Sequence, residues 1–206
     1  MSTALHELDH YCVPTSVAEA ELVVQRSRFL AIACPIQSRD QAHEFLQAQR
    51  ALHHKATHHC SAARLGHPEE AEAWSSDDGE PSGSAGMPML REIQGSGLSD
   101  LQVICVRWFG GIKLGTGGLA RAYADTARLA LQGLTRDTRV LRLPLRVRMP
   151  WSALTRVKRL MSELHALELS TQAAEDLVLE LAVPRSLVTR CREDLELILQ
   201  GKGEIL

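Results

Sequence analysis

The sequence of 206 residues lacks the features that define several classes of protein. No apolar run approaches the ~20 residues that a membrane-spanning helix needs. Residues 1–14 have neither the basic start nor the apolar core of a secretory signal. The five cysteines are widely spread and have no C-x-x-C spacing, which argues against a disulfide framework and a four-cysteine zinc site. We therefore expect a soluble, cytoplasmic protein with reduced thiols and no membrane partner.

A charge excess of either sign is also missing. The chain has 23 Lys and Arg against 25 Asp and Glu, a net charge of -2. Residues 1–132 carry 11 basic and 15 acidic side chains, and residues 133–206 carry 12 and 10. Neither part is basic enough for charge alone to indicate nucleic acid, so any basic surface must be local. The 45% of hydrophobic residues is typical of a folded globular protein.

The periodicity of the apolar residues predicts a mixed α+β protein with two domains. We expect a flexible lead-in over residues 1–18, a first domain over 19–136 and a second over 137–206. In the first domain the pattern predicts a central strand over 101–109, because that run is almost continuously apolar. It also predicts these elements: a strand or hairpin over 21–34, a helix over 39–52 capped by Ser38, a strand over 58–65, an irregular loop after it, and helices over 84–94 and 116–134.

The second domain has a cleaner pattern. Residues 141–149 alternate between an apolar face and an arginine-bearing face, which predicts a strand covered on one side. The elements that follow are a helix over 151–164, strands over 167–173 and 177–183, a helix over 187–198 and a strand near 204–206. This βαββαβ order is typical of the ferredoxin-like fold. Pro144 fits a central strand badly, so we expect a bulge or a nearby edge.

A glycine loop (Arg107–Gly118) joins the predicted central strand to a helix. Its five glycines favour close approach of a phosphate to backbone N–H groups at the helix start, and Lys113 and Arg107 would add charge. A G-x-G-x-x-A match begins at Gly115, but the long spacing after Phe109 and the missing second βαβ unit argue against a dinucleotide site. No Walker A lysine follows. Strand-to-helix packing alone is the alternative interpretation.

An acidic loop (Ser75–Pro88) carries Asp77, Asp78 and Glu80, whose oxygens suit Mg²⁺ or acid/base catalysis. Asp78-Gly79 is also a typical turn, and Glu80-Pro81 is typical of an extended step. No further signature defines a reaction. We therefore favour a structural turn over a metal or catalytic site.

Histidines gather at residues 53–59 next to Cys60, as possible zinc ligands. If the chain is extended there, His58 and Cys60 face one side and His59 the other, so we expect no metal. Gly-x-Ser-x-Gly is absent, which leaves a serine hydrolase unsupported. The arginine face of residues 141–149 could contact RNA phosphates, but Trp151 is the only aromatic residue in that domain, which favours a solvated face. We expect no cofactor.

Four blocks of sequence resemble the hallmark blocks of the IMPACT/YigZ family. They are RSRFLA (26–31), THHCSA (57–62), SDDGEPSGSAGMPML (76–90) and VRWFGGIKLGTGGLARAY (106–123). The resemblance covers about residues 21–134, and the remainder is similar to the family's bacterial C-terminal domain in element order. It implies a first domain like the second domain of ribosomal protein S-five and domain IV of the translocation elongation factor, followed by a ferredoxin-like domain. Both comparisons point to RNA or the ribosome.

The family blocks also imply a candidate binding surface. It comprises Arg28, His58, His59, Asp77, Asp78, Glu80, Pro81, Arg107, Gly110, Gly111, Lys113, Gly115, Gly117 and Gly118. Our hypothesis is a non-enzymatic, translation-associated regulatory protein that binds RNA or the ribosome. In it the glycine loop contacts phosphates and the acidic loop fixes the shape of one concave patch.

Two alternatives remain open at this stage. One is a phosphate- or nucleotide-handling enzyme that uses the same patch, and the other is a protein-protein interaction module. Eukaryotic relatives restrain a starvation-sensing kinase through a region additional to the shared domain. The sequence does not contain that region, so we do not expect kinase regulation.

Overall fold

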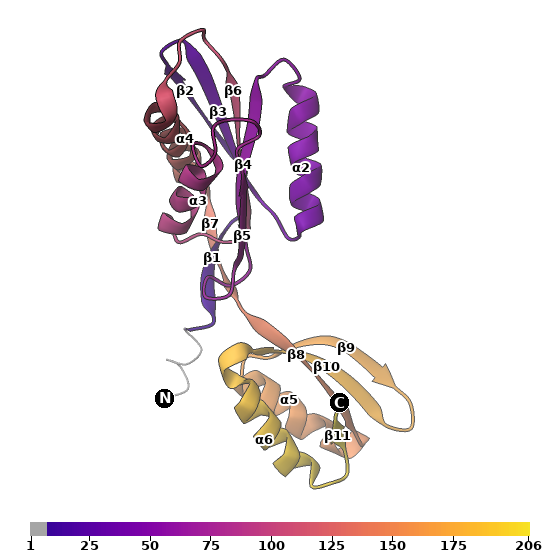
Figure 1. Cartoon of the computed structure of the whole chain (residues 1–206). Coiled ribbons are helices and arrows are strands. Elements are labelled where there is room, and N and C mark those ends of the chain that lie inside the picture. The colour runs from indigo at the N-terminus through magenta and orange to yellow at the C-terminus, as the bar shows by residue number, and fades with distance from the viewer. Residues whose placement is uncertain (1–7) are drawn as a thin grey trace. The chain divides into compact units, whose positions relative to one another are not determined.

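The computed structural model describes residues 8–206 and shows a mixed α+β protein (Figure 1). The chain forms two compact units. One comprises Tyr11–Arg139, and the other comprises Val140–Leu206 together with residues 8–10 from the start of the described chain. Residues 1–7 of the predicted lead-in lie outside the described residues. The predicted change of domain after residue 136 falls inside strand β7 (Arg136–Val140). Among the described residues, no helix combines the length and apolarity needed to cross a membrane.

The first unit is built on a five-stranded antiparallel sheet in the order β2-β3-β6-β4-β5. Its elements are β2 (Ala18–Val24), β3 (Ser27–Pro35), α2 (Arg39–Leu52), β4 (His58–Leu65), β5 (Glu72–Ser76), α3 (Gly86–Gly95), β6 (Leu101–Trp108) and α4 (Gly115–Gln132). Helix α2 covers one face of the sheet, and α3 and α4 cover the other (Figure 1). Strand β6 is central, as its apolar sequence predicts, and residues 101–107 are all buried.

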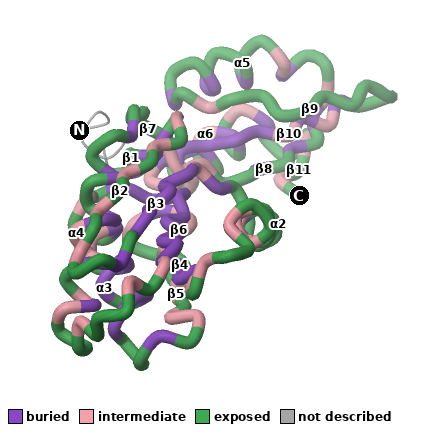
Figure 2. The backbone as a smooth tube through the Cα atoms, turned by 90° about the horizontal axis from the view of Figure 1, so that it is seen from above, coloured by how far each residue is buried: buried purple, intermediate pink, exposed green. Residues whose placement is uncertain are grey.

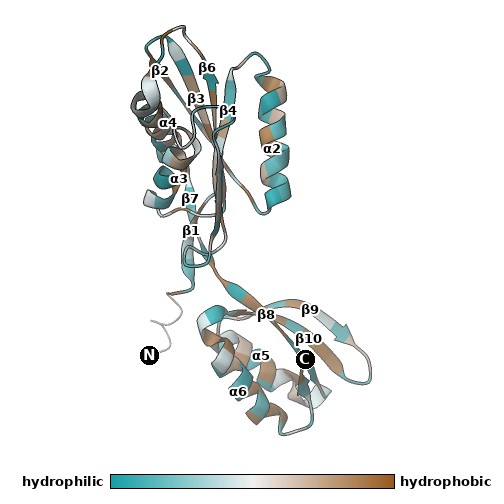
Figure 3. Ribbon diagram, viewed as in Figure 1, coloured by the Kyte–Doolittle hydropathy of each residue, from teal (hydrophilic) through white to brown (hydrophobic). Residues whose placement is uncertain are grey.

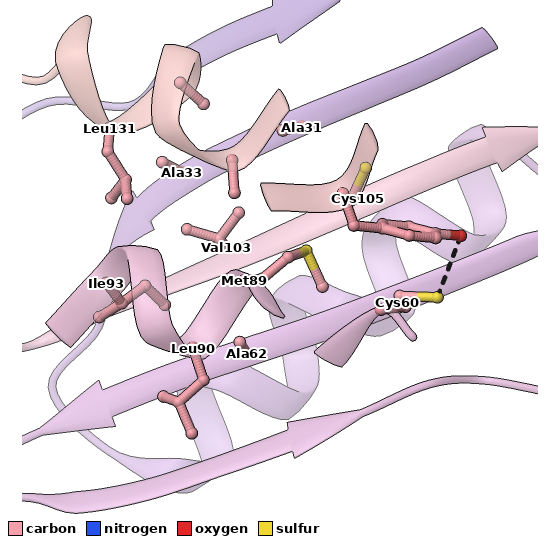
Figure 4. Packing of buried hydrophobic residues seen from close by; sticks show 14 of the residues in the cluster. Ala31, Ala33, Cys60, Ala62, Met89, Leu90, Ile93, Val103, Cys105 and Leu131 are labelled. Carbon is pink, nitrogen blue, oxygen red and sulfur yellow. Dashed lines mark hydrogen bonds between the residues drawn. The ribbon is translucent and has the colours of Figure 1, made fainter. Parts of the chain in front are cut away.

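Both faces of this sheet carry a hydrophobic core, and buried residues follow β3, β6 and β4 (Figure 2). Between the sheet and helices α3 and α4, Met89 and Ile93 pack against Val103 (Figure 4). On the other face Ile104 packs with side chains that include Phe45 of α2. Burial on two sides explains why the strand sequences are apolar without alternation.

Local signals explain several boundaries, and tertiary pairing explains the exceptions. Helix α2 begins where predicted, because the Ser38 hydroxyl accepts a bond of 3.1 Å from the Gln41 amide. The prediction of an irregular loop after residue 65 is wrong in part, since residues 72–76 form β5 by pairing with the edge of β4. Residues 10–14 of the predicted flexible lead-in likewise form strand β1 (His10–Pro14), which pairs with β7 in a two-stranded sheet.

The second unit has the predicted order of strands and helices. Its elements are β8 (Arg142–Met149), α5 (Leu154–Glu163), β9 (Leu167–Ala173), β10 (Leu177–Pro184), α6 (Val188–Leu199) and β11 (Glu204–Ile205). The sheet order is β11-β8-β10-β9, and both helices pack on one face over a core that includes Val147 and Leu179. Strand β11 pairs only with Val147 and Arg148, so Pro144 lies on a part of β8 that β11 does not reach. The nearby edge therefore accommodates the proline.

Candidate functional site

The glycine loop and the acidic loop border one pocket of about 440 Å³ in the first unit. It lies at the end of the sheet where β4 starts and β6 finishes, since His58 and Arg107 are paired there. The lining residues are Thr57, His58, Glu80, Pro81, Arg107, Phe109, Lys113, Leu114, Gly115, Thr116 and Leu119. The structure thus brings six of the predicted site residues to one pocket: His58, Glu80, Pro81, Arg107, Lys113 and Gly115.

A buried ion pair forms part of the pocket wall. Glu80 Oε1 accepts bonds from Arg107 Nη1 at 2.6 Å and from the Tyr123 hydroxyl at 2.7 Å. Residues Glu80 and Arg107 are only 9% and 4% exposed. Arg107 Nη2 also donates to Ser27 Oγ at 3.3 Å. Arg107 is therefore a paired group whose charge Glu80 compensates, not a second free cation beside Lys113.

His58 presents one ring nitrogen to Glu80. Its Nδ1 lies 2.8 Å from the carbonyl oxygen of Asp78, and because a carbonyl only accepts, Nδ1 carries a proton. Its Nε2 lies 3.9 Å from Glu80 Oε2. In the neutral imidazole this Nε2 is an acceptor, and in the charged form it is a donor.

The N-terminus of α4 borders the same pocket. The helix begins at Gly115, and the preceding residue, Leu114, provides no side-chain cap. First-turn N–H groups without such a cap carry partial positive charge and attract anions. Lys113 precedes this turn with an exposed side chain. This end of the pocket therefore favours a negatively charged group.

Glycine occupies the positions of the glycine loop for different physical reasons. A Cβ at Gly110 would lie 2.1 Å from the backbone carbonyl carbon of Arg26, so this glycine allows close contact with the β2–β3 turn. Gly111 and Gly115 have φ of +88° and +71°. Gly117 has neither feature, because its φ is ordinary and, beyond its chain neighbours and its own helix backbone, no atom of the described residues would lie within 4 Å of a Cβ added there. The fold does not require Gly117, and its absent side chain leaves the start of α4 open to a ligand.

The Asp77 side chain is hydrogen-bonded to backbone amides of the protein itself. Its carboxylate accepts bonds from the amides of Gly83, Ala85 and Gly86 at 2.8, 2.9 and 2.8 Å, the last two at the start of α3. Burial pushes the pKa of Asp77 up, but the three amides outweigh it and hold the pKa below its usual value. Asp77 thus fixes the acidic loop on α3.

Asp78 also turns toward the protein. Its Oδ1 lies 2.5 Å from Arg50 Nη2, and its Oδ2 accepts the His59 amide at 2.6 Å. Within residues 8–206, no group of three or more His, Cys, Asp or Glu is placed to hold a metal ion. The two aspartates of the acidic loop shape the site without lining it.

Other predicted site residues lie away from the pocket. Arg28 pairs with Glu21 at 2.8 Å, and its guanidinium lies 4.5 Å from the centre of the Trp108 ring. His59 is buried, and burial lowers its pKa. Its Nε2 has no hydrogen-bond partner in the described part of the chain. Gly110, Gly111, Gly117 and Gly118 do not line the pocket either.

Sequence reasoning missed Tyr123 and Phe109 as members of the site. Tyr123 belongs to the apolar stripe of α4, yet its hydroxyl binds Glu80 and accepts a bond of 3.3 Å from Cys60 Sγ, drawn as a dashed line in Figure 4. Burial raises the pKa of Cys60 to about 12, so this thiol stays protonated. Phe109 is 47% exposed at the pocket edge. An aromatic residue inside a glycine loop was the available signal for it.

Comparison with known proteins connects this geometry to a family. Residues 25–131 match the model of the Impact N-terminal domain. The chain is 29% identical over 200 residues to the Escherichia coli (strain K12) protein named IMPACT family member YigZ, covering 97% of this chain and 98% of that one. A Thermus thermophilus IMPACT family member is 40% identical over 143 residues, covering 69% of this chain and 76% of that one.

One solved structure has a similar fold along the whole chain. It is described as the crystal structure of a hypothetical protein, with 28% sequence identity and a TM-score of 0.72. The match covers 96% of this chain and 97% of that one. With the Impact N-terminal domain spanning more than half of its residues, the chain belongs to the IMPACT family.

Proposed function

We propose that this chain is a non-enzymatic, translation-associated protein that binds RNA, free or within the ribosome, and that the pocket holds an RNA phosphate. One observation carries the proposal. The N-terminus of α4 has no side-chain cap and opens, together with Lys113, on a pocket at the end of the sheet. Such a helix start binds phosphate through its N–H groups and its dipole.

Charge and exposure support the phosphate placement. Among residues 8–206, Lys113 forms no ion pair, whereas Arg107 is paired with Glu80. Lys113 is therefore the free cation of the pocket. Phe109 at the edge offers an exposed ring on which an unpaired base can stack. A phosphate site next to an exposed aromatic ring is typical of proteins that bind single-stranded RNA.

The remaining polar groups favour binding over catalysis. The Asp77 carboxylate accepts hydrogen bonds from backbone amides, and the Asp78 carboxylate pairs with Arg50. Cys60 is buried and protonated, so it is a poor nucleophile. These two aspartates and this thiol therefore serve the fold rather than acid/base or nucleophilic chemistry.

Fold topology supports the finer assignment of the two units. We assign the first to the fold of ribosomal protein S-five domain two and the second to the ferredoxin-like fold, with the domains at 19–136 and 137–206. The order β11-β8-β10-β9 corresponds to strands four, one, three and two of a βαββαβ unit. The resemblance relates the first of these folds to ribosomal protein S-five and to an elongation factor, which are both components of the translation machinery.

Co-sedimentation with ribosomes at low and high salt tests the proposal. We compare the unaltered protein with Lys113→Glu and with Lys202→Glu, which makes the same charge change in the second unit. Binding should weaken with salt, and Lys113→Glu should reduce the slope of log affinity against log salt by about 0.7–0.9, the value for one phosphate contact. Equal binding by both folded variants would refute the placement at Lys113.

A phosphorylated small molecule is the second candidate ligand. The pocket volume of about 440 Å³ falls within the range of small-molecule sites, and Pro81, Leu114 and Leu119 give it apolar walls. Titration calorimetry with nucleoside monophosphates distinguishes the two. Saturable binding of a mononucleotide without ribosome sedimentation would favour the small molecule.

A further inference from the structure

We infer that Glu80 and His58 bind a ribose 2′-hydroxyl, so that the pocket prefers RNA to DNA. This inference rests on the proposed function and assigns a specificity to the same pocket. The phosphate end of the pocket, at Lys113 and α4, cannot distinguish the two nucleic acids, because both carry the same phosphates. A group that contacts the sugar is needed for that distinction.

The Glu80 carboxylate is held in a fixed orientation by its buried partners. Arg107 and Tyr123 both donate to Oε1, at 2.6 and 2.7 Å. Oε2 faces the ring of His58, with 3.9 Å between Oε2 and Nε2. That separation is longer than a hydrogen bond. Oε2 therefore keeps capacity to accept a hydrogen bond from a ligand beside His58 in the pocket.

The charge of this carboxylate restricts what it can bind. A phosphate would be repelled by Oε2, so we place it with Lys113 and the α4 amides instead. A hydroxyl can donate to Oε2 and can also accept from His58 Nε2 when the imidazole is charged. A carboxylate that binds a ribose hydroxyl is also the device used in dinucleotide sites. A ribose hydroxyl fits this pair of groups better than a second anion.

The pocket can take both parts of one nucleotide. Its lining includes Glu80 and His58 together with Lys113, Gly115 and Thr116. Arg107 also belongs to the lining, where the residue is 4% exposed, and its buried Nε has no hydrogen-bond partner among residues 8–206. The pocket therefore offers groups for both parts of one nucleotide, Glu80 for the sugar and Lys113 with the α4 amides for the phosphate.

Fluorescence anisotropy with three labelled oligonucleotides tests the inference in the unaltered protein. The probes are a short single-stranded RNA, the DNA of the same sequence, and the same RNA with 2′-O-methyl groups. We expect the DNA to bind roughly tenfold more weakly, the loss of one hydrogen bond to a charged group. The methylated RNA should also bind more weakly, because it has no hydroxyl proton to donate.

A pair of variants then locates the contact. Glu80→Asp keeps the counter-charge for Arg107 but withdraws the carboxylate by one methylene, and Glu44→Asp makes the same change on an exposed position of α2. Thermal unfolding checks that both variants are folded. The preference for RNA should fall in Glu80→Asp and persist in Glu44→Asp.

The outcomes separate this inference from the proposed function. Equal affinity of the unaltered protein for RNA and DNA would overturn the sugar contact and leave RNA binding in place. Binding of neither nucleic acid would overturn both. A preference that is unchanged in folded Glu80→Asp would also overturn the inference, because it would place the sugar contact elsewhere.

Discussion

The two sheets of this protein differ in how many of their faces are covered. The five-stranded sheet of the first unit has α2 on one face and α3 with α4 on the other, whereas the four-stranded sheet of the second unit has both helices on one face. Their strand sequences differ accordingly. Residues 101–107 of β6 are all buried, while residues 145–149 of β8 alternate between buried residues and exposed arginines, as the alternating hydropathy of this strand in Figure 3 illustrates.

This difference restricts where each unit can bind a partner. With both faces of its sheet filled, the first unit has its pocket and candidate binding groups at the end of the strands, where β6 leads into the glycine loop. The second unit instead exposes a sheet face with Arg146 and Arg148. A sheet face is apolar where helices cover it and polar where it faces solvent. This rule leaves the first unit a pocket at the strand ends and the second unit an open sheet face.

Replacing neighbouring residues of β6 is the strongest test of this comparison. Ile104 faces α2 and Val103 faces α3 and α4, and both have 0% exposure. Ile104→Ala should destabilise the protein by about 3 kcal/mol and Val103→Ala by about 2 kcal/mol, because each leaves a cavity in a different core. Urea unfolding followed by circular dichroism measures both.

Strand β8 provides the control for this experiment. In β8 only the inward-facing residues are buried, so Leu145→Ala should lower the free energy of unfolding by about 3 kcal/mol. Replacing its outward-facing neighbour Arg146 should lower it far less. A negligible loss for either Ile104→Ala or Val103→Ala would show that one face of the first sheet is not tightly packed.

A substitution in the acidic loop should have a smaller effect on the free energy of unfolding, and this effect should depend on pH. Asp77→Asn removes the charge and replaces one of the two oxygens that accept three backbone amides by an NH2 donor, so it should destabilise the first unit by about 2 kcal/mol at neutral pH. Because the folded pKa of Asp77 is lowered, its contribution is present above the ordinary aspartate pKa of about 3.9 and disappears as the pH falls through the lower folded value.

Thermal unfolding from neutral to acid pH measures this difference. The curves of the unaltered protein and Asp77→Asn should converge at the acid end. Asp40→Asn, in the exposed first turn of α2, makes the same chemical change and should show little of it. A constant difference at all pH values would mean that the carboxylate charge is not what stabilises the loop.

Much of the fold could be predicted because its signals are local. Ser38 marks the start of α2, the apolar run at 101–108 marks the central strand, and the alternation in β8 marks a sheet with one covered face. Strands β1, β5 and β7 could not be found in this way. Their residues are polar or short of periodicity, and pairing makes them strands: β1 pairs with the distant β7, and β5 pairs with the edge of β4.

The candidate site was predictable in outline and not in its bonds. The sequence marked both loops as unusual, and Lys113 and Glu80 line one pocket. It gave no sign that Tyr123 would bond to Glu80, because a tyrosine in a helical apolar stripe is normally read as core. Nor could it show that Arg107 would be neutralised, since its partner is 27 residues away in sequence. Such pairings depend on tertiary contacts.

The smallest predicted effect concerns the outward face of β8. Arg146 is exposed and lies opposite Glu180 of β10, and no ion pair joins it to another described residue. Arg146→Ala should therefore change the free energy of unfolding by less than about 0.5 kcal/mol in the same urea experiment. A loss above about 1 kcal/mol would contradict the one-sided sheet, because an exposed arginine on a solvated face has little packing to lose.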